Sequence, residues 1–351
     1  MGKGYPFVNL QNIFGYNEID IDNLSLAEAS DTQLREYNLR KGDVLFVRSS
    51  VKLEGVGAAA LVPQSLINTT YSGFIIRFRD ESDMDYNFKR FIFAIKPIRD
   101  QVMAKATNSA NKNINQDVLN NIELFMPSKE EQKKIGQYFD HLDTLITLHQ
   151  RKCDSLKKLK KSMLQKMFPK NGSSCPEIRF AGFTDAWEQR KFSKQYVKIS
   201  EKNDLSFGTN KIISVANMYF KEEAKESSDE YMKTYNVMRV GDIAFEGNKS
   251  KNYAHGRFVE NTIGDGIVSH VFDVFRPIVD YDLMFWKYII NNENVMGKIM
   301  TRCTKASTMM TNLVADDFLK EKIAVPTIEE QQAIGTYFRN LDTLITLHQR
   351  M

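Results

Sequence analysis

Apolar residues recur at alternating spacings of three and four along residues 128–168, which is the pattern of a coiled-coil seam. Lys152 or Cys153 is the weak point of this seam. The seam positions are Ile135, Tyr138, Leu142, Leu145, His149, Leu156, Leu159 and Met163. The pattern therefore predicts one long helix in the middle of the chain.

A second stretch repeats the first. Residues 131–151 and 330–350 are identical at 16 of 21 positions, with an offset of 199. The same offset relates Gly-Asp-Val-Leu-Phe at 42–46 to Gly-Asp-Ile-Ala-Phe at 241–245, whereas the segments that follow, 48–52 and 247–251, share almost nothing. A duplicated enzyme would repeat its catalytic residues, so we expect a repeated frame that carries two different variable surfaces.

Both repeated helices have the same predicted start. Ser128 with Glu131, and Thr327 with Glu330, have the spacing of a capping box. A helix from Ser128 to Phe168 would be roughly 60 Å long at ~1.5 Å per residue. Prolines, glycine and asparagine at 168–176 end it.

The segments between the helices predict mixed strands and short helices, hence an α+β fold. Short alternating runs at 43–48, 73–78, 211–215 and 268–275 predict strands, and 88–98 and 281–291 predict short helices in corresponding places. The predicted architecture is two globular domains separated by long coiled-coil helices, with an internal pseudo-two-fold repeat. Its predicted parts are residues 1–127, 128–170, 171–326 and 327–351.

Charge is concentrated on the first helix. The chain has 351 residues, 42% of them hydrophobic, and a net charge of +4, yet residues 128–170 alone hold 11 Lys and Arg against 5 Asp and Glu. A solvated helix face and a face toward phosphates or a partner remain open readings. The near-neutral remainder argues against strong nonspecific DNA binding by this chain alone.

The location predicted from the sequence is cytoplasmic. No run of eighteen apolar residues occurs, and the N-terminus lacks a signal-peptide pattern. Cys153, Cys175 and Cys303 lack metal-ligand spacing and are an odd number, so they are expected to be plain thiols.

Motifs of nucleotide and cofactor chemistry are incomplete. Residues 55–60 begin like a dinucleotide fingerprint but lack its third glycine, and 247–250 lack the first glycine of a phosphate loop. Glu246 and Lys249 have one residue too many between them for a nuclease pair. His149 and His348 have no cysteine or carboxylate at ligand spacing, so they are interpreted as helix-seam residues rather than metal ligands.

Taken together, several motifs resemble the specificity subunit of type I restriction-modification systems. They are 176–180 (PEIRF), 183–188 (FTDAWE), the Gly-Asp strands and the Pro-x-x-x-Glu-Gln-x-x-Ile-Gly helix starts. The resemblance covers nearly the whole chain and implies two target-recognition domains, held apart by antiparallel helices, that read a split site in double-stranded DNA. It also implies a non-catalytic chain without cofactor or metal. Modification and restriction subunits are the implied partners, and they would use S-adenosylmethionine, ATP and Mg.

The sequence departs from this pattern at both ends. By the offset, Met1 corresponds to Ser200, so the first half lacks a counterpart of 176–199, and the second helix stops at Met351 where the first continues to Phe168. We expect either a cut or a rearranged gene product, and two chains associating through their helices is one hypothesis for compensation.

DNA-reading residues are expected in the divergent loops, because arginine, lysine, asparagine and glutamine match base edges in the major groove while serine, threonine and lysine position phosphates. The first half offers Arg48, Ser49, Ser50, Lys52, Lys105, Asn108, Ser109, Asn111 and Lys112, and the second offers Asn248, Lys249, Lys251, Tyr253, His255, Arg257, Arg302, Lys305, Ser307 and Thr308.

Two other classes of function remain open. A stand-alone dimeric DNA-binding regulator would use the same loops, although no helix-turn-helix or ribbon pattern stands out. A structural coiled-coil protein would bind other proteins through its halves. Salt-sensitive, sequence-selective DNA binding separates these readings.

Overall fold

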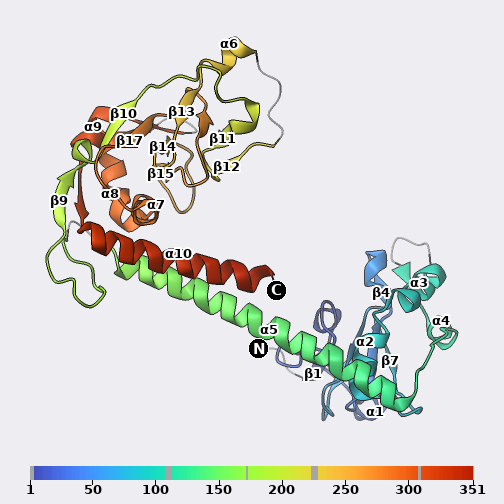
Figure 1. Ribbon diagram of the computed structural model, residues 1–351. Coiled ribbons are helices and arrows are strands. Elements are labelled where there is room, and N and C mark those ends of the chain that lie inside the picture. Colours follow the sequence, from blue (N-terminus) through green and yellow to red (C-terminus); the bar gives the residue numbers. More distant parts are fainter. Residues whose placement is uncertain (1–3, 108–111, 171–172, 223–227, 307–309, 351) are drawn as a thin grey trace. The chain divides into compact units, whose positions relative to one another are not determined.

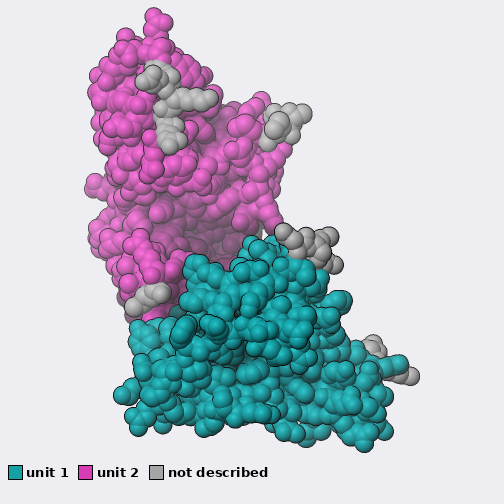
Figure 2. All heavy atoms as spheres, turned by 90° about the vertical axis from the view of Figure 1, so that its right-hand side faces the viewer, with its two compact units in different colours: residues 1–148 teal, residues 149–351 magenta. Residues whose placement is uncertain are grey.

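The computed structural model describes residues 4–107, 112–170, 173–222, 228–306 and 310–350 (Figure 1). The chain divides into two compact units, residues 1–148 and 149–351 (Figure 2). The division falls inside helix α5, Lys129–Lys166. Each unit therefore holds one part of that helix.

The first unit places short helices around small sheets. Its sheets have the strand orders β2-β1-β6 and β5-β3-β7, and β4 pairs with β8. The strands are β1 Tyr5–Val8, β2 Ser25–Ala27, β3 Val44–Val47, β4 Ser49–Ser50, β5 Ala59–Leu61, β6 Thr70–Tyr71, β7 Ile75–Phe78 and β8 Lys112–Asn113. The helices before α5 are α1 Asp31–Glu36, α2 Tyr86–Ile92, α3 Lys96–Lys105 and α4 Gln116–Asn120, with 3-10 turns η1 Leu10–Asn12 and η2 Leu53–Gly55.

The second unit is built around a four-stranded sheet of order β10-β17-β14-β15, with β9 paired to β20. Its strands are β9 Glu188–Lys191, β10 Tyr196–Ile199, β11 Ile213–Ser214, β12 Tyr219–Phe220, β13 Asn236–Met238, β14 Ile243–Glu246, β15 Arg257–Glu260, β16 Gly266–Val268, β17 Val274–Pro277, β18 Thr304–Ala306, β19 Thr311–Leu313 and β20 Lys322–Val325. Its helices are α6 Asp229–Met232, α7 Leu283–Ile290, α8 Glu293–Cys303, α9 Ala315–Lys320 and α10 Ile328–Arg350, with 3-10 turns η3 Phe192–Lys194 and η4 Thr209–Lys211.

Mixed helices and strands in both units confirm the predicted α+β fold. Two boundaries within it were predicted wrongly. Residues 88–98 form the end of α2 and the start of α3 rather than one helix, because Pro97 sits in the first turn of α3, where proline favours a new helix start. The run 268–275 divides between β16 and β17, which belong to different sheets.

The repeated Gly-Asp segments form the same buried ion pair in both units. Asp43 is 2% exposed and accepts hydrogen bonds from Arg79 Nε at 2.8 Å and Nη2 at 2.7 Å. Asp242 is 1% exposed and binds Arg276 in the same bidentate way, at 3.0 and 2.9 Å. The Asp242 carboxylate raises the pKa of Arg276, while burial raises the pKa of Asp242 and Arg276 opposes that shift.

The position before each aspartate requires glycine because its backbone φ is positive. Gly42 and Gly241 have φ of 87° and 89°, a region that glycine adopts without a Cβ clash. Each aspartate then accepts a hydrogen bond from the backbone N–H three residues earlier, Arg40 or Arg239, at 2.8 Å. The turn before β3 and before β14 is therefore built identically.

The starts of the two repeated helices agree with part of the predicted capping box. The hydroxyls of Ser128 and Thr327 accept the backbone N–H of Glu131 and Glu330 at 3.3 and 3.4 Å. The Glu330 carboxylate does not complete the box, because it accepts hydrogen bonds from Arg179 at 2.9 and 2.7 Å and from Trp187 Nε1 at 3.1 Å. These contacts fasten the 176–188 loop to the start of α10.

Within the second unit, α10 packs antiparallel to the C-terminal part of α5 (Figure 1). His149 contacts His348, Cys153 lies against the Ile345 carbonyl, and the Lys160 ammonium binds Asp342. The interpretation of the two histidines as seam residues therefore agrees with the contact between them.

The seam itself differs from the predicted one. Cys153 is 1% exposed and continues the seam, so it is not a weak point, because its small side chain fits against α10. Leu159 is 40% exposed, and Lys160 takes the inward position through its ion pair with Asp342. In the first unit, Tyr138 and Leu145 are 62% and 50% exposed.

Gly335 and its repeat equivalent Gly136 allow each helix to approach a neighbouring helix start. A Cβ on Gly335 would lie 2.1 Å from Asp282 Oδ1 and 2.9 Å from the Phe285 nitrogen, and one on Gly136 would lie 2.5 Å from the Phe88 nitrogen. Asp282 and Asp85 are the N-caps of α7 and α2. The glycine of the repeated Ile-Gly motif is therefore needed for packing.

We predict that Gly335→Ala lowers the free energy of unfolding by roughly 1–3 kcal/mol, because the added methyl overlaps the N-cap of α7. Denaturant unfolding measures this. The matched control is Gly297→Ala in α8, where the nearest atom, 2.9 Å away, is the end of the Glu293 side chain. That change should be neutral or stabilising by up to about 1 kcal/mol. Equal losses from both changes would contradict the packing argument.

Glu260 is a buried carboxyl group in the core sheet of the second unit. It is 1% exposed, and neither of its side-chain oxygens has a hydrogen-bond partner among the described residues. Burial raises the pKa of Glu260 well above 4.5, helped by Asp282 and opposed by Lys287. The repeat equivalent, Leu61, is an equally buried apolar residue, so the frame accepts a hydrocarbon here.

We predict that Glu260→Leu stabilises the second unit increasingly as the pH rises above about 4.5. The unfolded chain ionises there while the folded chain keeps its proton, so wild-type stability falls as pH rises toward the folded-state pKa. The gain is roughly 1.4 kcal/mol for each pKa unit that folding adds. Urea unfolding at about pH 4 and about pH 8 measures it. A gain of equal size at both pH values would show that burial does not hold the proton.

Candidate nucleic-acid interface

In the first unit, the two predicted DNA-reading loops meet at one end of the β3 sheet. Arg48 follows β3, and β4 then pairs with β8 so that Ser49 faces Asn113 and Ser50 faces Lys112. The Arg48 backbone N–H donates to the Phe74 carbonyl, and its own carbonyl accepts the Ile114 N–H. The Arg48 side chain remains exposed beside this strand pair.

The other candidates of the first unit have different surroundings. Lys52 is exposed. Lys105 Nζ donates to the Asn121 carbonyl at 2.7 Å, which directs this ammonium toward its own chain. Asn108, Ser109 and Asn111 lie outside the described residues.

The second unit repeats the arrangement with different side chains. Gly247, the repeat equivalent of Arg48, follows β14, and its carbonyl accepts the Thr311 N–H at 2.9 Å and the Thr311 hydroxyl at 3.0 Å. Asn248 then bridges to Met310. A Cβ on Gly247 would lie 2.3 Å from the Thr311 carbonyl oxygen, so glycine is required for this approach.

This contact brings the two predicted loops of the second unit together. In the loop after β14, Asn248, Lys249 and Lys251 are exposed. In the other loop, Lys305 is exposed on the β18–β19 hairpin, whose second strand begins next to Met310. Ser307 and Thr308 lie outside the described residues. Each unit therefore presents exposed cationic groups where a central strand ends and a distant segment joins it, and the second unit adds the exposed amide of Asn248.

Arg257 and Tyr253 are bound within the unit. The Arg257 guanidinium lies 5.0 Å from the centre of the Tyr253 ring and 3.9 Å from the buried Glu246 carboxylate, and it donates to the Ala216 carbonyl. The Tyr253 hydroxyl donates to the Asn291 carbonyl at 3.4 Å. Burial raises the pKa of Glu293, and nearby His255 opposes this shift. Arg257 and Tyr253 thus support the loop that contains them, and His255 lies near Glu293.

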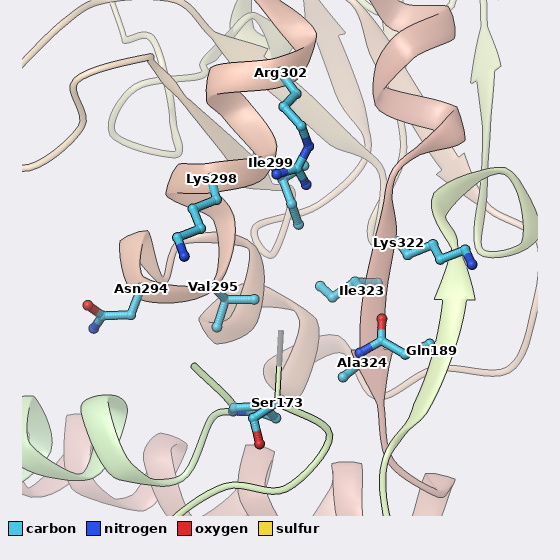
Figure 3. Close-up of a pocket in the computed structure, with 11 residues that line it drawn as sticks. Ser173, Gln189, Asn294, Val295, Lys298, Ile299, Arg302, Lys322, Ile323 and Ala324 are labelled. Carbon is cyan, nitrogen blue, oxygen red and sulfur yellow. The ribbon is translucent and has the colours of Figure 1, made fainter. Parts of the chain in front are cut away.

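Arg302 lies at a cavity apart from the Asn248 contact. It forms a bidentate pair with Glu321, which raises the pKa of Arg302. Figure 3 shows Lys298 and Arg302 on α8, with Lys322 on β20 at the same cavity. The cavity has a volume of about 200 Å³ and is lined by Pro169, Ser173, Gln189, Asn294, Val295, Lys298, Ile299, Arg302, Lys322, Ile323 and Ala324.

Sequence reasoning missed some of these neighbours. Lys298 and Lys322 belong to no divergent loop, and Asn113 faces Ser49 although it was not among the candidates. A signal for Asn113 existed, since it adjoins Lys112. Nothing in the sequence links Lys298 with Lys322, because they come to line the same cavity only through tertiary packing.

Chemistry that needs clustered ligands finds little support in the described ranges. There, no group of three or more histidine, cysteine, aspartate or glutamate side chains could hold a metal ion. None of the described helices is both long and apolar enough to cross a bilayer. What the loops offer is hydrogen-bond donors and acceptors on strand ends, which suit recognition of base edges and phosphates.

Comparison with known proteins gives concordant matches. Residues 3–158 match the family model described as the type I restriction modification DNA specificity domain. The chain is 24% identical over 261 residues to the type I restriction enzyme MjaVIII specificity subunit of Methanocaldococcus jannaschii, covering 68% of this chain and 59% of that protein. It is 26% identical over 173 residues to the EcoKI specificity subunit of Escherichia coli, covering 48% and 37%. The chain thus spans less than two thirds of the length of either curated relative.

The solved structures agree in fold. The crystal structure of the HsdS subunit from Thermoanaerobacter tengcongensis superposes with a TM-score of 0.55 at 15% identity, over 99% of this chain and 84% of that one. Two α+β units, a repeated helix and variable strand-end loops define a duplicated two-unit fold. Residues 3–158 are thus similar to the DNA specificity domain of type I restriction-modification systems, and both curated relatives are specificity subunits of such systems.

Proposed function

We propose that this chain is the DNA sequence-recognition subunit of a type I restriction-modification complex. Residues 1–127 and 171–326 act as two target-recognition domains, each reading one part of a split site in double-stranded DNA. Residues 128–170 form the spacer helix between them, and residues 327–351 form the second repeated helix. The observation that carries the proposal is a repeated frame with exposed, divergent polar side chains at equivalent strand ends.

The repeated frame keeps the start of each central strand and varies its end. The Asp43–Arg79 and Asp242–Arg276 pairs build the same strand start, and the strand ends then present Arg48 in one unit and Asn248 in the other. Arginine pairs with guanine edges and asparagine with adenine edges. Different side chains on one frame fit two readers of different base sequences.

The chain is non-catalytic in this proposal, and its partners do the chemistry. Modification subunits would supply methyl transfer from S-adenosylmethionine, and restriction subunits would use ATP and Mg. A cytoplasmic location without membrane attachment follows from this role and stays a prediction. Two alternatives make different predictions. A stand-alone regulator would bind specific DNA without methylation partners. A structural coiled-coil protein would bind no specific DNA sequence.

Co-expression with the modification subunit encoded in the same genome tests the proposal. Methylated adenines mapped across host DNA by single-molecule sequencing should define a split motif with a fixed spacer. A complex that forms without methylation, or no complex at all, would count against the proposed role.

We predict that Lys249→Ala and Arg48→Ala each weaken reading of a different half-site. Both side chains are exposed at equivalent strand ends, and loss of a base contact costs about 1–3 kcal/mol, or roughly tenfold to a hundredfold in affinity. Competition binding of the assembled complex to DNA altered in one half-site measures this, and each variant is the matched control of the other. Equal loss for every DNA sequence would identify these residues as phosphate contacts instead.

A further inference from the structure

Each unit carries an exposed apolar side chain on the turn that precedes β7 or β17. Phe74 is 58% exposed and Val271 is 68% exposed. They lie five residues before Arg79 and Arg276, the arginines of the two buried ion pairs, and β7 and β17 pair with β3 and β14 in the same register. A single exposed apolar residue has no functional meaning by itself. Here one recurs at the equivalent place in both units.

The two turns are built alike. The Ser72 carbonyl accepts the Ile75 N–H at 2.9 Å, and the Ser269 carbonyl accepts the Phe272 N–H at 3.0 Å. Ile75 is buried, and Phe272 packs against a core cluster of its own unit. The Ser72 hydroxyl also accepts the Phe74 N–H at 3.2 Å. Each exposed side chain therefore stands on a turn whose backbone is held in place.

Both turns lie at the variable end of the central strand. In the first unit, the Arg48 N–H donates to the Phe74 carbonyl at 2.7 Å. In the second unit, the Phe245 N–H donates to the Asp273 carbonyl at 3.2 Å, and Val271 lies two residues further toward the turn. Each turn therefore joins the loops that carry the polar DNA-reading candidates.

An apolar side chain at this place matches a feature of DNA that the polar candidates do not. Arginine pairs with guanine edges and asparagine with adenine edges. Thymine presents a C5 methyl group in the major groove, and apolar side chains, phenylalanine among them, contact it. A turn that places phenylalanine or valine beside a polar strand end therefore suits a thymine next to the bases that the polar residues read.

We propose that Phe74 and Val271 are specificity residues that contact thymine C5 methyl groups in the major groove, one in each half-site. This inference rests on the proposed DNA recognition and adds a third loop to each reading surface. Phenylalanine offers the larger apolar area, so the loss of Phe74 should weaken binding more than the loss of Val271.

The test is competition binding of the assembled complex to DNA that carries the mapped split motif. Replacing thymine with deoxyuridine removes only the methyl group. At one thymine of the half-site read by the first unit, this replacement should weaken wild-type binding about fourfold, because burial of one methyl group contributes roughly this much. Phe74→Ala should bind roughly tenfold more weakly and should not respond to the same replacement.

Ile67→Ala is the matched control. Ile67 is 86% exposed in the same unit, but its neighbour Leu66 pairs with Leu39, which precedes the start of β3 rather than its end. This change should leave the affinity and the response to deoxyuridine as in wild type. Val271→Ala should act on the other half-site only.

Several outcomes would overturn this inference while the proposed function stands. They are selective binding without a deoxyuridine effect in the first half-site, an equal effect in wild type and Phe74→Ala, and a first half-site that contains no thymine. Loss of complex assembly in Phe74→Ala would also overturn it, because the side chain would then contact a subunit. If wild type shows no sequence-selective binding, the proposed function itself fails, and this inference fails with it.

Discussion

A buried aspartate held by an arginine underlies both units. Asp43 and Asp242 directly precede the central strands β3 and β14. Their partners lie on a neighbouring strand: Arg79 directly follows β7, and Arg276 is part of β17. Removing one partner of such a pair typically costs about 3–5 kcal/mol, because the other charge is left buried. The strand's starting point, and therefore the place where its variable end emerges, depends on this contact. The loops that differ between the units can vary because the aspartate–arginine pair at the strand start is the same in both.

The repeated helices show how one sequence acquires two environments. Phe338, Leu341 and Ile345 on α10 are 0%, 5% and 9% exposed, whereas their identical counterparts on α5, Phe139, Leu142 and Ile146, are 42%, 36% and 60% exposed. The difference has a direct cause. In the second unit, residues 153–168 pack along α10, whereas no described segment of the first unit packs along the first part of α5 in this way.

Glu330 and Glu131 differ in the same way. Glu330 is 1% exposed because Arg179 and Trp187 bind it from the 176–188 loop, and Glu131 is exposed. The motif that led to the family resemblance thus has a structural role, because it covers the start of a repeated helix and leads into β9, which pairs with β20. Its residues hold α10 and β9 in place and are not part of the variable loops.

The sequence by itself determined the duplication, the long helix, the α+β class and the joining of variable loops to a repeated frame. These depend on local patterns: seam spacing, capping residues, and a glycine before an aspartate. Tertiary structure decided which polar residues face outward. Arg257, which the sequence predicts to contact DNA, lies half-buried on Tyr253 beside Glu246, whereas the exposed Arg302 pairs with Glu321. It also decided that Cys153 joins the seam and that His149 meets His348, because contacts between residues nearly two hundred positions apart depend on how the chain returns on itself.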